Sequence, residues 1–481
     1  MARGVLVNDV HSRLNPTRVR EVVPVASLDA LVDTVRAARR EGVPVCVAGG
    51  RHAMGGQAFA EGGVLIDTRH LARIGRLDPE AATVEVEAGI QWPALIDGLA
   101  ALQGSAAEPL TIAQKQTGAD RLTIGGAVAA NIHGRGLTMR PLVADLEALA
   151  IVDAEGEVRV ASRRDDPELF ALAVGGYGLF GVVASVTLRL VPRRKVERLV
   201  ALERVDDLMA AFSRRVGEGC VYSDFQFAID ESSPEFLRDG ILSCYRPVSP
   251  RTPLPERPRE LSRPDWRYLV ELAHIDRRRA FQHYVEHYLG TAGQVYWSDT
   301  HQLGVYLDNY HRALDRRLRS RVPASEVIGE LFVPRAALPG FMAEAAADLR
   351  RRGVAVIYGT VRLIEHDGES FLEWAREPYA CVVFNLHTEH SRQGLNATAG
   401  AFRSLIDLAL RRGGSYYLTY HRWATQPQVE AAHPRMKEFL RRKAQRDPGG
   451  LFQSEWYRHH VDMLGPSRAP RVEERCAQRY A

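Results

Sequence analysis

Cysteine is scarce in this chain, because only five of its 481 residues carry a thiol. Their odd number and wide spacing exclude a disulfide framework, and no Cys-x-x-Cys pair is present for a metal. This usage favours a reducing compartment, so we expect a cytoplasmic protein. The five are Cys46, Cys220, Cys244, Cys381 and Cys476.

A secretory leader and a convincing membrane span are also lacking. Residues 1–25 carry charges throughout and have no apolar centre. Residues 170–188 are uncharged and long enough to cross a bilayer, but four glycines interrupt them and their last seven residues follow a strand-like pattern. A helix, a glycine turn and a buried strand therefore fit this stretch better than a membrane span.

Neither sign of charge dominates, because 63 basic side chains face 59 acidic ones and the net charge is +4. The basic clusters are interleaved with acids, which is typical of solvated helix faces, and we expect no nucleic-acid partner. Hydrophobic residues make up 46% and charged residues 25%, which is the balance of a globular protein. The length exceeds what one hydrophobic core normally supports, so two domains are expected.

Strands and short helices alternate through the first part of the chain. Ser27 is a good N-cap for a helix that closes at Gly42, and Pro93 stands in the first turn of a second helix. This mixture predicts an α+β fold class. Strands are expected at 44–48, 64–67, 83–87, 149–152 and 158–161, the last two forming a hairpin.

The pattern changes after Arg193, where longer helices are expected at 335–352 and 397–412. The proline-rich residues 247–264 are interpreted as a surface loop or a lid. A second mixed domain is the simplest interpretation of this part.

Glycines mark two candidate ligand loops. The strand at 45–48 stops in a glycine turn with His52 at its tip, and glycine there lets backbone N–H groups approach a ligand closely. The segment 122–134 contains a Gly-Gly pair among small residues, which fits a flat ring or a pyrophosphate, or else a tightly packed crossing of elements. The literal Gly-x-Gly-x-x-Gly at 176–181 has a helix before it and a strand after it, the reverse of a nicotinamide-binding fingerprint, so we reject that interpretation.

Together, these segments, the hairpin and residues 175–183 resemble the FAD-binding domain of the vanillyl-alcohol oxidase superfamily over about the first 195 residues. Residues 124–134 and 178–183 are similar to the decaprenylphosphoryl-ribose oxidases, and the first loop more distantly to sugar-alcohol and aldonolactone oxidases. The resemblance implies bound FAD and a two-subdomain FAD-binding fold with an α+β substrate (cap) domain. We expect the FAD-binding domain at 1–195, the cap domain at 196–425, and a C-terminal segment at 426–481 that packs back on the first domain.

The same resemblance implies which residues hold the cofactor. Covalent members of the superfamily bond a histidine at the place of His52 to the flavin 8α-methyl group, whereas the decaprenylphosphoryl-ribose oxidases lack that histidine. A covalent bond, a hydrogen bond to FAD and a structural role therefore stay open for His52. The expected FAD contacts are Ala48, Gly49, Gly50, Arg51, His52, Ala53, Met54, Gln57, Gly118, Thr123, Gly125, Gly126, Ala129, Ile132, His133, Gly178, Val183 and Tyr417.

Five residues are candidates for the chemistry. Tyr420 stands where the decaprenylphosphoryl-ribose oxidases carry a lysine; a tyrosine can donate a hydrogen bond or, with a lowered pKa, act as a base. The resemblance places Cys381 at a cysteine that lines the substrate pocket of that family and Arg362 near a basic pocket residue. Ordinary alternatives are a structural role for His133, an inert buried thiol for Cys381 and an unpaired surface position for Glu330. The five are Tyr420, His133, Glu330, Arg362 and Cys381. The His-x-x-His at 387–390 is weak as a metal motif, and we expect no metal.

The resemblance implies an FAD-dependent oxidoreductase that oxidises a CH–OH group of a sugar-like, polyol or lactone substrate by hydride transfer to flavin N5. An FAD-dependent, sterol-type alkene reductase and a non-catalytic flavin-binding protein stay as alternatives. The expected partner is a small molecule, without nucleic acid or a membrane span. The residues indicate neither the oligomeric state nor the electron acceptor.

Overall fold

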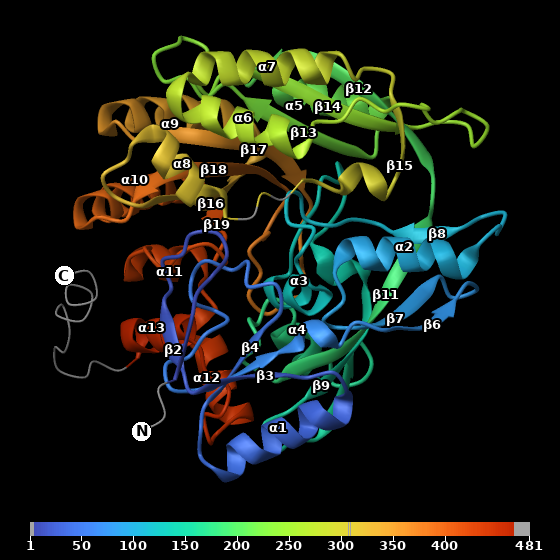
Figure 1. The fold of residues 1–481 in the computed structure, drawn as a ribbon, viewed down its shortest axis with the longest axis vertical. Helices are drawn as coiled ribbons and strands as arrows, with labels where there is room; N and C mark the ends of the chain where they lie inside the picture. Colours follow the sequence, from blue (N-terminus) through green and yellow to red (C-terminus); the bar gives the residue numbers. More distant parts are fainter. Residues whose placement is uncertain (1–3, 306, 308, 466–481) are drawn as a thin grey trace.

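The computed structural model describes residues 4–305, 307 and 309–465. Three sheets organise the first part of the chain, and one large sheet organises the second (Figure 1). The elements of the first part are β1 (Val5–Val7), β2 (Thr17–Val19), β3 (Glu21–Pro24), α1 (Leu28–Arg40), β4 (Val45–Ala48), β5 (Val64–Asp67), β6 (Ile74–Asp78), β7 (Thr83–Glu87), α2 (Trp92–Gln103), β8 (Leu110–Ile112), α3 (Ile124–Ala130), β9 (Leu146–Val152), β10 (Val158–Ser162), α4 (Pro167–Ala173) and β11 (Val182–Pro192).

The second part carries most of the helices. Its elements are β12 (Lys195–Arg204), α5 (Leu208–Gly217), β13 (Tyr222–Phe227), β14 (Asp239–Pro247), α6 (Arg263–Ile275), α7 (Arg277–Leu289), β15 (Val295–Trp297), α8 (Tyr310–Leu318), β16 (Ala324–Pro334), α9 (Leu338–Arg352), β17 (Val356–Ile364), β18 (Tyr379–Glu389), α10 (Arg392–Leu410), β19 (Ser415–Tyr416), α11 (Gln426–Ala432), α12 (Met436–Arg446) and α13 (Glu455–Leu464).

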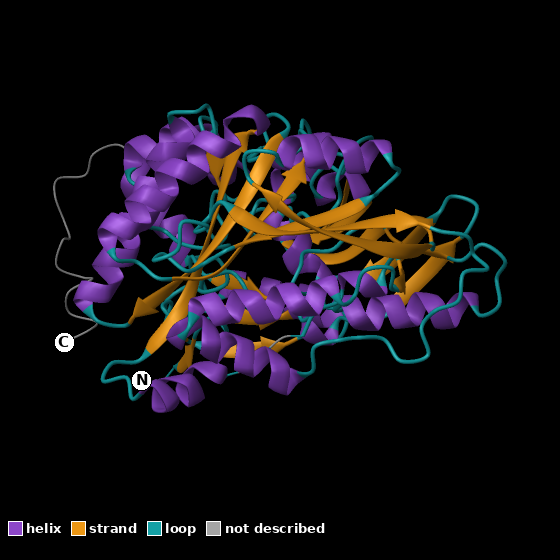
Figure 2. Cartoon of the chain, turned by 90° about the horizontal axis from the view of Figure 1, so that it is seen from above, coloured by secondary structure: helices purple, strands orange, loops and turns teal. Residues whose placement is uncertain are grey.

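The sheets differ in the direction of their strands. Strands β3, β5 and β4 form a small parallel sheet, whereas β10, β9, β11, β7 and β6 form an antiparallel one to which β8 adds through β11. The large cap sheet is antiparallel in the order β15-β12-β14-β13-β17-β18-β16-β19. Seen from above, strands run through the middle of the molecule and helices surround them (Figure 2).

Local signals explain the boundaries of the first helices. The Ser27 hydroxyl accepts a hydrogen bond from the Ala30 N–H at 3.2 Å and so caps α1, whose apolar side buries Leu31, Val35 and Ala38. Helix α4 precedes the glycine run at 176–181 and β11 follows it, so the order inferred from the sequence is confirmed. Among the described residues, no helix combines the length and the apolar character needed to cross a membrane.

Two expected helices start elsewhere. Residues 335–337 form a short 3-10 turn, so α9 begins at Leu338 rather than at Arg335. Helix α10 begins at Arg392, five residues before the expected start, because the Ser391 hydroxyl accepts the Gly394 N–H at 3.0 Å. The polar first turn of α10 hides this start from a search for apolar periodicity.

The C-terminal segment contacts the first part of the chain. The Val45 N–H donates to the Leu451 carbonyl at 2.7 Å, and the Gln453 N–H donates to the Val45 carbonyl at 2.8 Å. Residues 451–453 thereby lie along β4, and Figure 1 shows α12 and α13 beside the first strands. The four cysteines within the described residues are buried and unbridged, and Cys476 lies outside those residues.

Candidate active site

A cavity of about 760 Å³ runs from the loop after β4 to the cap sheet. Its size is that of a site for a large cofactor and a small substrate. Of the expected FAD contacts, those that line it are Ala48, Gly49, Gly50, Arg51, His52, Ala53, Gln57, Gly118, Gly125, Gly126, Ala129, Ile132, His133, Gly178, Val183 and Tyr417.

Two expected contacts lie behind the cavity wall. Thr123 caps α3, because its hydroxyl accepts the Gly126 N–H at 3.2 Å. The Met54 N–H donates to the Thr419 carbonyl at 3.0 Å. Both residues position the loops rather than line the space between them.

The loop after β4 needs its glycines. A Cβ atom on Gly49 would lie 2.0 Å from the Thr123 hydroxyl, and one on Gly50 would lie 2.4 Å from the Arg121 carbonyl oxygen. Only glycine therefore lets this loop pack against the start of α3 while it lines the cavity.

The same loop offers backbone donors to a ligand. Within the described part of the chain, the N–H groups of Gly49, Gly50, Arg51 and Ala53 donate to no other protein group. Successive N–H groups of this kind form an anion-binding nest, which suits a pyrophosphate. The loop therefore fits the phosphate portion of FAD.

His52 lies in this loop with a second histidine behind it. The two side chains meet through His11 Nε2 and His52 Nδ1, which are 2.8 Å apart, and both residues line the cavity. Burial, together with the charge of His311, lowers the pKa of His11 to about 4, so the His11 ring is neutral at physiological pH. Sequence reasoning missed His11, because nothing near it marks a loop or a ligand.

Side chains of the cap sheet close the other end of the cavity. Alternate residues of a strand share one face of the sheet, and strands β16, β17 and β18 each contribute two such side chains to the cavity. Strand register places Glu330 opposite Val383 and Arg362 opposite Cys381 on neighbouring strands. The lining residues of the sheet are Ile328 and Glu330 on β16, Val383 and Asn385 on β18, and Tyr358 and Arg362 on β17.

Glu330 is the centre of a buried polar cluster. One of its oxygens, Oε1, contacts His133 Nε2 in a very short bond and accepts the Cys381 S–H at 2.7 Å. Burial raises the pKa of Glu330, but the His133 charge and the hydrogen bonds outweigh it and leave the pKa below its usual range. The carboxylate is therefore the stable form at neutral pH.

His133 has its other nitrogen engaged as well. Its Nδ1 lies 3.2 Å from the Gly134 carbonyl oxygen, which can only accept, so Nδ1 carries a proton. The bond between Nε2 and Glu330 then needs a second proton, which the two groups share. The pair therefore holds one exchangeable proton at the cavity wall.

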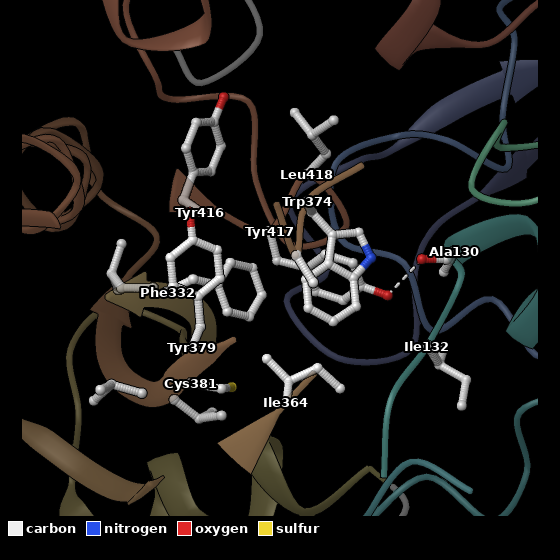
Figure 3. Packing of buried hydrophobic residues seen from close by; sticks show 14 of the residues in the cluster. Ala130, Ile132, Phe332, Ile364, Trp374, Tyr379, Cys381, Tyr416, Tyr417 and Leu418 are labelled. Carbon is white, nitrogen blue, oxygen red and sulfur yellow. Dashed lines mark hydrogen bonds between the residues drawn. The ribbon is translucent and has the colours of Figure 1, made fainter. Parts of the chain in front are cut away.

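Cys381 lies behind this wall and does not line the cavity. Figure 3 places it in the packed cluster with Phe332, Ile364 and Tyr379. Burial and the neighbouring Glu330 raise the pKa of its thiol well above the usual range, so it stays protonated and donates to the carboxylate. Cys381 therefore contacts Glu330 rather than the cavity, whereas Val383, two residues further along β18, lines it.

The segment after β19 brings two tyrosines to the cavity. The Tyr417 hydroxyl donates to the Ala130 carbonyl at 2.6 Å and so fastens this segment to α3 (Figure 3). Burial, with the charge of Glu330, raises the pKa of Tyr420 well above its usual range. Tyr420 is therefore a hydrogen-bond donor, and its use as a base is disfavoured.

Comparisons with known proteins agree with this arrangement. Residues 19–162 match the family model described as an FAD binding domain. The chain is 24% identical to decaprenylphosphoryl-beta-D-ribose oxidase of Mycolicibacterium smegmatis over 93% of this chain and 95% of that protein. Residues 19–162 are thus similar to an FAD-binding domain. The chain's likeness to flavoproteins of the vanillyl-alcohol oxidase superfamily, the expected fold class and FAD as cofactor are thereby confirmed.

Other relatives match a smaller part of the flavoprotein. The chain is 32% identical to cytokinin dehydrogenase 7 of Oryza sativa subsp. japonica over 36% of this chain and 32% of that protein. It is also 32% identical to L-gulono-1,4-lactone dehydrogenase of Mycobacterium tuberculosis over 37% of this chain and 41% of that protein. The chain thus matches less than half the length of these two relatives.

Sequence reasoning missed two arginines that line the cap end of the flavoprotein's cavity. Arg198 is buried and donates to the Tyr245 hydroxyl at 2.7 Å and to the Thr291 hydroxyl at 2.8 Å, while Arg135 donates to the Thr117 hydroxyl at 3.1 Å. No described carboxylate lies within ion-pair distance of either. Arg135 follows the glycine segment directly, which was an available signal; Arg198, on β12, had none.

Proposed function

We propose that this flavoprotein oxidises a CH–OH group of a sugar-like, polyol or lactone substrate, with hydride transfer to flavin N5. The proposal rests on the convergence of a proton-sharing pair, a tyrosine donor and an arginine on the cap end of the cavity that the FAD loops line. Bound FAD supplies the hydride acceptor. The relatives named for sugar-derived substrates support the substrate class.

The polar groups divide the work of an alcohol oxidation. Glu330, held by His133 and the Cys381 thiol, accepts the proton of the substrate hydroxyl. Tyr420 donates to a substrate oxygen, because its raised pKa keeps the hydroxyl protonated. Arg362, paired with Asp224 at 2.9 Å, orients a neighbouring oxygen without adding net charge to the wall. Cys381 is a positioning residue in this scheme.

The substrate itself is proposed to carry an anionic group. Arg198 lies among aromatic rings, with its guanidinium 4.7 Å from the centre of the Tyr296 ring and 5.0 Å from that of Tyr288. A buried guanidinium without a carboxylate partner is stabilised by an anion that binds beside it. Arg135 adds a second positive charge to the same wall. An acidic sugar derivative therefore fits this end better than a neutral polyol.

A direct experiment tests the reaction class. Purified holoenzyme is mixed without oxygen with panels of polyols, sugars, aldonolactones and their acidic derivatives, and the flavin absorbance is followed. We expect bleaching with a member of the CH–OH panel and a much slower reaction in Glu330→Gln at equal flavin content. Bleaching by NAD(P)H with no response to any carbinol would indicate an alkene reductase instead. A flavin that no donor reduces would indicate a binding protein without catalysis.

We also propose that His52 bonds covalently to the flavin. The contact between His52 Nδ1 and the neutral His11 ring orients the His52 side chain in the loop that lines the cavity. Acid precipitation separates the two outcomes: covalent flavin stays with the pellet in the wild type and is released in His52→Ala. Release of all colour from the wild type would refute the covalent bond without affecting the proposed reaction.

A further inference from the structure

A second buried cluster of histidines surrounds Glu326 in the cap, on the same face of β16 and β18 as the cavity lining. Strand register places Glu326 directly opposite His387, two residues from Ile328 and Asn385. Helix α6 brings His274 to the same point, one turn after Val270, which lines the cavity. The proposed reaction uses none of these three residues.

The contacts of His274 orient its ring toward Glu326. Its Nδ1 lies 2.7 Å from the Val270 carbonyl oxygen, which only accepts, so Nδ1 carries a proton. Its Nε2 lies 2.9 Å from Glu326 Oε1. A cation shared by Nε2 and Oε1, either a proton or a metal ion, satisfies both atoms. A backbone carbonyl on the far nitrogen is also the usual second contact of a metal-binding histidine.

The other groups complete a set of ligands. His387 Nδ1 lies 3.5 Å from the same Oε1 atom, and the three ligand atoms all lie within 4.8 Å of one another. In a tetrahedral zinc site with bonds of about 2.0–2.2 Å, neighbouring ligand atoms are about 3.3 Å apart. The observed separations from Oε1 lie on either side of that value, so small movements would bring all three into coordination.

The second carboxylate oxygen is held separately. Glu326 Oε2 accepts a short hydrogen bond from the Tyr310 hydroxyl and lies 3.1 Å from His311 Nδ1. These contacts orient Oε1 toward His274 and His387, as outer contacts of metal ligands do. The Glu326 and His274 side chains are 3% and 4% exposed and His387 is 24% exposed, so an ion has a route from solvent beside His387.

We propose that His274, Glu326 and His387 bind a divalent transition-metal ion, with Zn²⁺ as the ion that this ligand set suits best. Three protein ligands leave one position for water. The ion ties α6 to β16 and β18, and so fixes the wall formed by Val270, Ile328 and Asn385. This proposal replaces the expectation from the sequence that no metal is bound, and it does not depend on the proposed reaction.

Metal analysis of the full-length holoenzyme tests the site. The protein is prepared without a histidine tag, stripped with a chelator, incubated with Zn²⁺ alone, desalted and analysed by mass spectrometry. We expect one zinc per chain in the wild type, with a rise in melting temperature over the stripped protein. Glu326→Gln and His387→Ala should lose the zinc and the rise.

His390→Ala is the matched control. It removes the other histidine of the same His-x-x-His sequence, but His390 contacts the Ser325 hydroxyl at 2.8 Å and no member of the cluster. It should keep the zinc. Flavin absorbance reports whether each variant is folded, and diffraction at the zinc edge places the ion in the wild type. Zinc-free wild type after incubation, or zinc that all variants retain, would overturn the proposal and leave an imidazolium–carboxylate cluster.

Discussion

Lys443 and Asp447 form a buried ion pair that holds the C-terminal segment against β4. Lys443 Nζ lies 2.6 Å from Asp447 Oδ2, and the two side chains are 0% and 4% exposed. The Asp447 carboxylate also accepts the N–H groups of Leu451 and Phe452, each at 2.9 Å. Since those residues lie along β4, which leads into the FAD loop, the pair stabilises the cofactor end of the molecule.

Replacing Lys443 with methionine keeps the aliphatic stem but leaves a buried carboxylate without its partner. Removing one member of a buried pair destabilises proteins by about 3–5 kcal/mol. Burial lowers the pKa of Lys443 and the Asp447 carboxylate opposes that effect, so Asp447 stabilises the ammonium form. We expect Lys443→Met to lower the free energy of the first unfolding transition in urea by about 3–5 kcal/mol.

Lys437→Met on the same helix is the matched control. Lys437 Nζ lies 2.9 Å from Glu430, but the two side chains are 61% and 40% exposed. An exposed pair contributes about 0–1 kcal/mol, so this variant should stay close to the wild type. The double variant Lys443→Met/Asp447→Asn should lose less stability than Lys443→Met. Equal effects of Lys443→Met and Lys437→Met would refute the argument.

The remaining predictions concern two residues of the site and the pH dependence of activity and of stability. Glu330→Gln should lower kcat/KM for the substrate by roughly 10²–10⁴-fold at unchanged flavin content, measured by anaerobic stopped flow, because it removes the proposed proton acceptor. The lowered pKa of Glu330 should also keep wild-type kcat/KM constant from neutral pH down through the usual carboxyl range; a loss near neutral pH would point to another base. Tyr420→Phe should raise KM more than it lowers kcat if the hydroxyl mainly binds substrate, and a new alkaline limb in its pH profile would contradict that role. Burial, with the charges of Arg376 and His460, lowers the pKa of His433 to about 3. The unfolded chain binds that proton first as pH falls below the usual histidine value, so His433→Phe should gain about 2 kcal/mol relative to wild type between pH 7 and pH 5, measured by urea unfolding. His70→Phe, at an exposed position, serves as the control.

Much of the FAD-binding domain could be predicted because its signals are local. A strand that stops at Ala48, a glycine pair at 125–126 and the N-cap at Ser27 are each readable within a few residues. The boundaries of α9 and α10 could not be placed as well. A 3-10 turn and a polar first turn carry no apolar period, so hydrophobic spacing marks only the buried middle of a helix.

At the cap end of the site, the sequence indicated separate candidate residues but not how they meet. Glu330, Arg362 and Val383 come together because three strands pair in one register, and a shift of one residue would turn them all to the other face. Short-range sequence patterns do not contain that register. The register also decides where the two histidines of the His-x-x-His at 387–390 lie. The sequence alone does not show that their side chains fail to meet, or which other residues each one contacts.

The end of strand β18 gives His387 and His390 different neighbours. Strand β18 ends at Glu389, so His387 pairs with Glu326 across the sheet while His390 turns to Ser325. Glu326 is 61 residues from His387 and 52 from His274, and no local motif joins them. A ligand set built from a strand pair and a covering helix has no fixed spacing, because the sheet register and the helix position decide which atoms meet. Such sites are therefore found by asking which buried imidazole and carboxylate groups from distant parts of the chain converge on one point.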